Sequence, residues 1–292
     1  MTDPINLKSG LAVLVGRTNV GKSTLLNALV GTKIAIVTPK PQTTRDTYHG
    51  ILTRPEGQIV FVDTPGIFKT QPSNLVANLH HKVRDALEGI DVLVQVVDPT
   101  RAIGTEDSRV TDMVERAPQP RILVLNKLDV SSRPYRETWL ERAPKYSNVV
   151  EVSALEPRNI NLLIDAIFQH LPVGPFQYPK GQTSNVTNEF WIGEIIREKL
   201  FLKTQQELPY TATVQVSLVE DRKNKLGEKI LYIKATILTT DDRHQRMLIG
   251  QGARKIRDIG SFARKELEVA MNKKVFLDLD VVVDDEWISR MR

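Results

Sequence analysis

The stretch Gly16-Arg-Thr-Asn-Val-Gly-Lys-Ser23 constrains the fold of this chain more than any other part of its sequence. It follows the apolar run Leu11–Val15 and leads into the amphipathic stretch Lys22–Val30, which predicts a buried strand, a glycine-containing turn and a helix. It fits the pattern G-x-x-x-x-G-K-[ST], in which backbone N–H groups at a helix N-terminus surround a phosphate. The sequence therefore predicts a phosphate-binding loop, with Lys22 reaching the β- and γ-phosphates and Ser23 holding Mg²⁺.

Short apolar runs alternate with amphipathic stretches as far as residue 172. The predicted strands are Leu11–Val15, Ile59–Val62, Val92–Val97, Ile122–Leu125 and Val149–Val152, and the predicted helices are Lys22–Val30, Leu75–Leu87, Asp107–Arg116 and Ile160–His170. Alternation of this kind predicts an α/β domain with a mostly parallel sheet and helices on both faces.

A second motif, Asp63-Thr-Pro-Gly66, stands at the end of the predicted strand Ile59–Val62. An Asp at the end of a strand beside a phosphate loop holds Mg²⁺, directly or through water. Gly66 lacks a side chain, so its backbone N–H can approach the γ-phosphate closely. Asp63 and Gly66 are therefore predicted to lie at the phosphate end of a nucleotide site.

A third motif, Asn126-Lys-Leu-Asp129, follows the predicted strand Ile122–Leu125. A carboxylate at position 129 can accept hydrogen bonds from both N1–H and N2–H of guanine, and adenine offers neither group. Asn126 can contact the other edge of the purine and Lys127 can stack on the sugar. The segment Ser153-Ala-Leu155, after the fifth strand, can support the same base through a backbone N–H.

A fourth motif, Gln42-Thr-Thr-Arg-Asp46, lies in the loop after the first predicted helix. A Thr hydroxyl in this loop can complete the coordination shell of Mg²⁺ and sense the γ-phosphate. Thr44 is the predicted ligand and Thr43 is the alternative. The segment Lys33–Tyr48 has few apolar anchors, which favours a switch between ordered and disordered states.

The last hundred residues predict a smaller α+β domain. Its predicted order is α-β-β-α-α-β, with helix Glu189–Phe201, strands Thr211–Val219 and Lys229–Leu238, the basic stretch Gly250–Gly260, helix Ser261–Met271 and strand Val275–Val283. The segment Leu171–Gly181, which contains three prolines and two glycines, is the predicted linker. The predicted domains are 1–172 and 189–292, joined by a linker at 173–188.

Taken together, these motifs resemble the translation-factor-like class of P-loop GTPases, and within that class the Era family, whose second domain is a KH domain of the prokaryotic type. The resemblance is carried by residues 19–23, 43–45, 63–66 and 126–129 in the first domain, and by residues 196–199, 207–210 and 249–260 in the second. It implies a GTP-hydrolysing switch that binds small-subunit (16S) ribosomal RNA and assists assembly of the 30S subunit. It also implies peripheral association with the inner face of the cell membrane.

The site residues follow from the motifs and the resemblance together. The predicted nucleotide contacts are Gly16, Asn19, Val20, Gly21, Lys22, Ser23, Thr24, Asp63, Gly66, Asn126, Lys127, Asp129, Ser153, Ala154 and Leu155, with Lys22, Thr44 and Asn19 as catalytic residues and Ser23, Thr44 and Asp63 as Mg²⁺ ligands. GTP, GDP and Mg²⁺ are thus the predicted nucleotides and cofactor.

The residue after Gly66 raises the question of how water is activated. Ile67 stands where Ras-like enzymes carry a Gln that orients the attacking water, so hydrolysis is slow or the water is held by other means. In several relatives of this class the Asn of the phosphate loop helps to bind a monovalent cation, and Asn19 matches that position. K⁺ is therefore a further candidate cofactor, and the alternative is that Asn19 only shapes the loop.

The KH loop departs from the family pattern. Family members read Gly-x-x-Gly, whose backbone clamps RNA phosphates, whereas this chain reads Gly250-Gln251-Gly252-Ala253. The methyl group of Ala253 can crowd a nucleotide, or can penalise a positive φ by roughly 1 kcal/mol. The predicted RNA-binding residues are Gly250, Gln251, Gly252, Ala253, Arg254, Lys255 and Arg257. A second departure, Thr18 in place of Pro, is expected to have little effect.

Composition bounds the remaining alternatives. The chain has 292 residues, 26% charged and 41% hydrophobic, with no cysteine, which excludes disulfides and cysteine-ligated metals. No apolar run approaches the ~20 residues that span a bilayer, and Met1–Gly10 lacks a secretory pattern, so we expect a cytoplasmic chain. We also expect a monomer, although no pattern in the sequence shows the oligomeric state.

Two alternative functions remain open. Residues 186–292 hold 19 Lys and Arg against 17 Asp and Glu, and this near balance, together with Ala253, keeps open a GTP-dependent switch whose second domain binds a protein. A second alternative, prompted by Ile67, is a scaffold that binds GTP without hydrolysing it.

Overall fold

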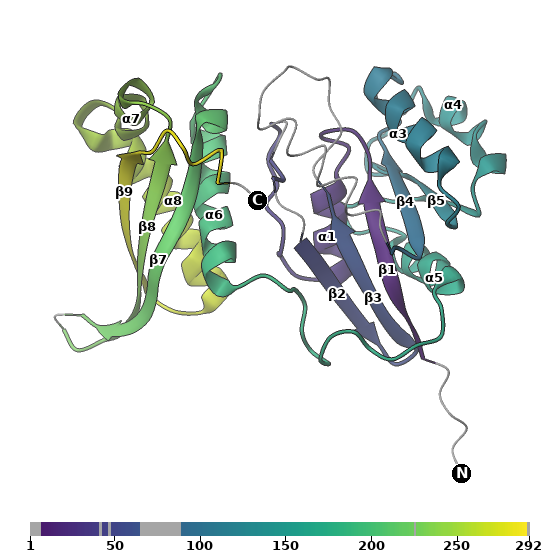
Figure 1. Cartoon of the computed structure of the whole chain (residues 1–292), viewed down its shortest axis with the longest axis horizontal. Coiled ribbons are helices and arrows are strands. Elements are labelled where there is room, and N and C mark those ends of the chain that lie inside the picture. Colours follow the sequence, from purple (N-terminus) through teal and green to yellow (C-terminus); the bar gives the residue numbers. More distant parts are fainter. Residues whose placement is uncertain (1–6, 41–42, 46–47, 65–88, 225, 291–292) are drawn as a thin grey trace, which may run out of the picture. The chain divides into compact units, whose positions relative to one another are not determined.

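The computed structural model describes residues 7–40, 43–45, 48–64, 89–224 and 226–290. The chain divides into two units, Met1–Asn185 and Val186–Arg292, and each has its own sheet (Figure 1). The predicted helix Leu75–Leu87 lies outside the described residues.

The first unit is built on a six-stranded sheet with the strand order β2-β3-β1-β4-β5-β6. The strands are β1 (Lys8–Val15), β2 (Tyr48–Arg54), β3 (Gly57–Asp63), β4 (Val92–Val97), β5 (Arg121–Leu125) and β6 (Asn148–Glu151). Every neighbouring pair is parallel except β2 and β3. The carboxyl ends of β1, β3, β4, β5 and β6 therefore meet at one edge of the sheet, where parallel α/β sheets bind their ligands.

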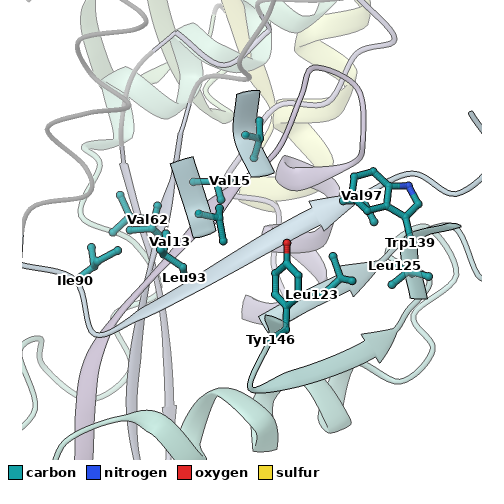
Figure 2. Packing of buried hydrophobic residues seen from close by; sticks show 12 residues of the cluster. Val13, Val15, Val62, Ile90, Leu93, Val97, Leu123, Leu125, Trp139 and Tyr146 are labelled. Carbon is teal, nitrogen blue, oxygen red and sulfur yellow. The ribbon is translucent and has the colours of Figure 1, made fainter. Parts of the chain in front are cut away.

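The helices of this unit cover both faces of the sheet. They are α1 (Lys22–Val30), α3 (Thr105–Arg116), α4 (Arg136–Leu140) and α5 (Ile160–His170), with a 3-10 turn η1 (Ala143–Lys145). Val13 and Val15 of β1 belong to a buried cluster with Val110 and Val114 of α3, and Figure 2 shows the strand residues of this cluster. Because successive side chains of a strand point to opposite faces, Leu14 is buried on the face opposite this cluster. The predicted fold class is confirmed.

The edge strand β2 was not predicted from the sequence. It pairs with β3 in register from Tyr48 opposite Asp63 to Arg54 opposite Gly57. Its sequence, YHGILTR, contains a glycine and no alternation of polar and apolar residues, so local pattern gives no strand signal. Pairing with β3 through a tight turn supplies what the local sequence lacks.

The segment predicted as the linker, 173–188, packs on the first unit along most of its length. Gln58 of β3 is fully buried, and its side chain accepts a hydrogen bond from the backbone N–H of Tyr178 (2.9 Å) and donates one to its carbonyl (2.9 Å). Farther along, the backbone N–H of Asn185 bonds the carbonyl of His49 at 3.4 Å. The proline and glycine content that suggested a linker therefore describes an irregular strap, and the division between units falls after Asn185.

The second unit has the predicted order α-β-β-α-α-β. Its elements are α6 (Asn188–Lys203), η2 (Leu208–Thr211), β7 (Ala212–Lys223), β8 (Lys229–Thr239), α7 (Asp242–Ile249), η3 (Gln251–Ala253), α8 (Arg254–Met271) and β9 (Val275–Val283). The sheet order is β7-β8-β9, antiparallel and then parallel. Three α8 residues spaced by four, Ile259, Ala263 and Leu267, are fully buried. Helix α8 begins at Arg254 and not at Ser261 as predicted, so residues 254–260 of the basic stretch are helical.

Candidate functional site

The loop between β1 and α1 has the backbone that phosphate binding requires. Gly21 adopts φ +98°, and a Cβ there would lie 2.3 Å from the Asn126 side-chain nitrogen, so only glycine fits. A Cβ at Gly16 would lie 2.5 Å from the Val96 carbonyl. The loop therefore passes close to β4 and to the residue after β5, and it leads directly into the N-terminus of α1.

Lys22 is buried in this loop. Its ammonium donates to the carbonyls of Gly16 at 3.0 Å and Arg17 at 2.9 Å. Burial lowers the pKa of Lys22 to about 8, and the charges of Asp63 and Glu106 oppose that shift. The ammonium is thus held at the phosphate loop by backbone oxygens and is only partly stabilised as a cation.

The three predicted Mg²⁺ ligands lie together although they come from three segments of the chain. The Ser23 hydroxyl donates to Asp63 Oδ2 at 2.9 Å and lies 3.0 Å from the Thr44 hydroxyl, which is 3.5 Å from the same carboxylate oxygen. The alternative, Thr43, instead donates to the Lys40 carbonyl at 2.8 Å. Of the two adjacent threonines, Thr44 is therefore the one that faces Ser23 and Asp63.

The Asp63 carboxylate fits a cation. It is fully buried, and burial raises its pKa, against the opposing effects of Lys22 and of its hydrogen bonds to Ser23 and Thr44. Its Oδ1 has no hydrogen-bond partner among the residues that the structure describes. A buried carboxylate with a free oxygen beside two hydroxyls is the hard oxygen donor set that Mg²⁺ prefers.

The segment between α1 and β2 has more anchors than the sequence suggested. Ile34, Ala35 and Ile36 are buried, and the Asn27 side chain accepts hydrogen bonds from the backbone N–H groups of Ile34 (3.0 Å) and Ala35 (2.9 Å). The start of the proposed switch is therefore fixed, and any order–disorder change is confined to the residues beyond it.

The Asn19 side chain faces this segment from the phosphate loop. Asn19 adopts a left-handed φ of 62°, and its amide donates to the Pro39 carbonyl at 2.7 Å. The amide nitrogen thus holds the switch segment across the mouth of the phosphate loop. The contact with Pro39 was not predicted from the sequence, and both predictions for Asn19, cation ligand and loop-shaping residue, stay predictions.

The base-reading residues lie at the ends of β5 and β6. The Asn126 side chain donates to the Val20 carbonyl at 2.9 Å and accepts from the Ala154 N–H at 3.0 Å, so it joins the phosphate loop to the segment after β6. The Ser153 hydroxyl donates to Asp129 Oδ1 at 2.5 Å. Sequence reasoning assigned residue 153 only to a backbone contact, whereas its side chain orients the Asp129 carboxylate.

A cavity of about 580 Å³ connects these groups. Its lining includes the predicted residues Asn19, Gly21, Thr24, Asn126, Lys127, Asp129, Ala154 and Leu155. Leu155 is 74% exposed, which leaves its side chain available to cover a base. Arg101 and Val130 also line the cavity and were not predicted from the sequence.

Asp98 is a further residue that sequence reasoning missed. It is buried, and Lys127 donates to its Oδ2 at 2.6 Å. The bonds from Lys127 and from Thr100 hold the pKa of Asp98 below its usual value, although burial opposes them. Lys127 adopts a left-handed φ of 65°, and the ion pair fixes the lysine stem at the rim of the cavity. The signal for Asp98 in the sequence was its place directly after a buried strand.

Gly66 and Ile67 lie outside the described residues.

In the second unit, the loop between α7 and α8 has three left-handed residues. They are Gly250 (φ 71°), Gly252 (φ 57°) and Ala253 (φ 58°). The positive φ that was expected for the last position is thus found at a residue with a Cβ, at a cost of about 1 kcal/mol relative to glycine. Gln251 and Gly252 are exposed, so they are accessible to a ligand.

The basic residues after this loop are divided in their contacts. Arg257 turns back onto the loop and donates to the carbonyls of Gly252 and Ala253, the second at 3.2 Å. Arg254 is exposed on the first turn of α8, and Lys255 is partly buried. The loop therefore presents backbone and Arg254 to solvent, while Arg257 stabilises its shape.

No helix in the described part of the chain is both long enough and apolar enough to cross a membrane.

The chain matches known protein families in both units. The family described as 50S ribosome-binding GTPase matches residues 11–127, and the family described as KH domain matches residues 207–288. GTPase Era of Halothermothrix orenii is 38% identical over 288 residues, covering 97% of this chain and 95% of the relative. GTPase Era of Deinococcus deserti is 39% identical over 292 residues, covering 98% and 94%.

Two solved structures are similar along nearly the whole chain. The crystal structure of Era in complex with MgGDPNP and nucleotides 1506–1542 of 16S ribosomal RNA has a TM-score of 0.88 and 32% identity, covering 97% of this chain and 96% of that one. A variant of Aquifex aeolicus Era bound to GDP and AlF4⁻ has a TM-score of 0.88, 31% identity and the same coverage. Identity of this extent over both units confirms the family that the motifs suggested. The chain belongs to the GTPase Era family of GTP-hydrolysing enzymes.

Proposed function

We propose that this chain is a GTP-dependent switch that binds small-subunit ribosomal RNA through the α7–α8 loop and assists assembly of the 30S subunit. The first unit binds GTP in the cavity between the phosphate loop and the ends of β5 and β6. The observation that carries the proposal is that the relative crystallised with both MgGDPNP and 16S ribosomal RNA covers 97% of this chain, so both units have counterparts in one complex.

In this proposal each motif of the first unit has one task. Gly16 to Thr24 surround the phosphates, Asp129 reads guanine, and Asn126 and Ala154 hold the purine edge. Ser23, Thr44 and Asp63 would hold Mg²⁺, whose charge neutralises the β- and γ-phosphate oxygens. The buried Oδ1 of Asp63, which has no hydrogen-bond partner in the described part of the chain, supports this assignment, because a bound cation offsets the cost of burying that carboxylate.

We expect the α7–α8 loop to be the RNA contact. Replacing both Gln251 and Gly252 by Asp should abolish binding of a purine-containing single strand, since two carboxylates would face the phosphates. The control replaces the same two residues by Asn, which tolerates the left-handed φ of position 252 about as well as Asp but adds no charge. Ala253→Gly should raise affinity, because it removes both the strain and the methyl group. Electrophoretic mobility shifts at several salt concentrations measure all three variants.

The alternative partner is a protein. If the variant with Asp at positions 251 and 252 binds RNA as tightly as the parent chain does, the loop is not the RNA site. That result would favour the protein-binding alternative. Steep loss of RNA affinity with rising salt is expected for phosphate contacts, and a flat dependence would also favour the alternative.

We expect hydrolysis to be faster in K⁺ than in Na⁺ at equal ionic strength, and Asn19→Ala to erase the difference. The reason is that Asn19 lies at the mouth of the phosphate loop, in a chain that has no Gln after Gly66. Single-turnover rates in the two salts measure this. Asn19 also holds Pro39, so a variant that is equally slowed in both salts, with the ratio preserved, would assign Asn19 to the switch segment alone. The non-hydrolysing scaffold, the other alternative from the sequence, is disfavoured by membership of a family of GTP-hydrolysing enzymes.

Cytoplasmic location, peripheral membrane association and the monomeric state remain predictions. Partition of the purified chain between buffer and vesicles of anionic lipid would test the second.

A further inference from the structure

Helix α3 and the segment before it, residues 98–104, are tied to the phosphate loop by a buried ion pair and a hydrogen bond. Asp107, in the first turn of α3, lies 2.7 Å from the guanidinium of Arg17, the second residue of the phosphate loop. Asp107 is 3% exposed and Arg17 is 9% exposed. The same guanidinium nitrogen donates to the carbonyl of Ala102 at 3.2 Å.

Arg17 lines neither cavity of the nucleotide site, but its backbone carbonyl contacts Lys22. Neither Arg17 nor Asp107 lines the cavity that holds the base-reading motif, or the smaller one around Lys22 and Ser23. The Arg17 carbonyl, however, accepts a hydrogen bond from the Lys22 ammonium at 2.9 Å. A continuous path of polar contacts therefore runs from Asp107 through the whole of Arg17 to the ammonium of Lys22.

A purely structural reading of Asp107 also has support. Its Oδ2 accepts the Gly104 N–H at 2.9 Å, which caps the start of α3. Capping alone, however, does not require a buried arginine. Burying two charges costs more free energy than their mutual attraction supplies unless the geometry of the pair is excellent. What this ion pair adds to the cap is a fixed position for Arg17 of the phosphate loop.

The opposite end of the same segment is built in a similar way. Asp98, where the segment begins, binds Lys127 of the base-reading motif at 2.6 Å. Two buried carboxylates, one at the start of this segment and one in the first turn of the helix that follows it, thus each hold a basic residue of a different nucleotide-binding motif. This repetition favours a positioning role over two unrelated ion pairs.

We infer that Asp107 is a positioning residue for GTP hydrolysis, which acts through Arg17 to fix the backbone oxygen that orients the Lys22 ammonium. The inference rests on the proposed role of Lys22 at the phosphates. It adds helix α3, which contributes no predicted contact with the nucleotide, to the parts of the fold on which the chemistry depends.

A double-mutant cycle tests this. Asp107→Asn keeps an acceptor for the Gly104 N–H, and thus the helix cap, but removes the charge; Arg17→Gln removes the other partner. Each should lower the single-turnover rate at saturating GTP by about tenfold, the scale of one lost charged hydrogen bond. The double variant should be no slower than either single variant, because both changes break one path. Asp112→Asn, on an exposed position of the same helix, is the matched control and should hydrolyse GTP at the parent rate.

Arg17→Lys keeps the cation and should recover most of the rate that Arg17→Gln loses. Unchanged turnover in Asp107→Asn, additive losses in the double variant, or an Arg17→Lys variant as slow as Arg17→Gln would each overturn the inference. The parent chain separates this from the proposed function: if the parent chain did not bind GTP, the nucleotide site itself would be misassigned, whereas a normal parent rate with normal variants removes only the role of Asp107.

Discussion

Replacing Asp129 by Asn should lower the affinity for GTP by more than tenfold and raise the affinity for xanthosine triphosphate. The Asp129 carboxylate is the proposed acceptor for two guanine N–H groups, and hydrogen bonds to a charged group contribute about 1.5–3 kcal/mol each. An amide at position 129 offers an N–H group where guanine also offers one, but xanthine carries an oxygen there. Isothermal titration calorimetry with both nucleotides measures the exchange of specificity.

The structure indicates that Asp129→Asn changes the guanine contact while leaving the support of the side chain in place. The Ser153 hydroxyl donates to Asp129 at 2.5 Å, and the Asn side chain keeps an oxygen that can accept this bond. Asp165→Asn, on an exposed position of α5, is the matched control and should bind GTP as the parent chain does, since residue 165 is not among the cavity residues. Unchanged GTP affinity in Asp129→Asn would reject Asp129 as the guanine reader.

The nucleotide motifs could be predicted because each is contiguous and stands at a strand end. A strand that ends in a glycine-containing turn leaves its next residues at the carboxyl edge of the sheet, whatever the rest of the chain does. The parallel register then brings residues 16–23, 63 and 126–129 to the same edge. Almost all residues of the proposed nucleotide site could therefore be predicted from the sequence.

The supporting contacts could not be predicted, because they join residues far apart in the chain. Asp98 and Lys127 are 29 residues apart, and Gln58 and Tyr178 are 120 apart. A buried Gln inside an apolar strand gives no local sign of its partner, so the strap after α5 reads as a linker. The choice of Thr44 over Thr43 depends in the same way on which side of an irregular segment faces Ser23.

In the second unit, one local argument succeeded and another failed. A positive φ was considered for the last residue of the α7–α8 loop, at a cost in conformational free energy, and Ala253 has φ 58°. The start of α8 was predicted seven residues too late, because the glycines of this stretch suggested a break and glycine usually ends helices. Here Ala253, in its left-handed conformation, is the residue directly before α8, and the basic stretch runs on into that helix.

Lys22→Ala should remove most GTP affinity and hydrolysis while the chain keeps its fold. Among the described residues, the Lys22 ammonium bonds only to backbone oxygens of its own loop, so its loss breaks no hydrogen bond between different elements of the fold, although it removes a charge interaction with Asp63. Its charged contacts with the β- and γ-phosphates, at about 1.5–3 kcal/mol each, imply a loss of tenfold or more in affinity. Equilibrium binding of a fluorescent GTP analogue, with circular dichroism as the check on folding, measures both. A variant that hydrolysed GTP at the parent rate would contradict the assignment of the phosphate loop.

The pH dependence of binding gives the same lysine a second signature. Burial lowers the Lys22 pKa to about 8 in the nucleotide-free chain, so the ammonium loses its proton as the pH rises through that value. Phosphates favour the ammonium and raise its pKa again, so binding takes up a proton above pH ~8 and affinity should fall as pH rises from 7 to 9. In Lys22→Ala this part of the pH dependence should be missing, because the titrating group is gone. If both chains lost affinity equally over that range, the titration would belong to another group, and Lys22 would be fully protonated in the free loop.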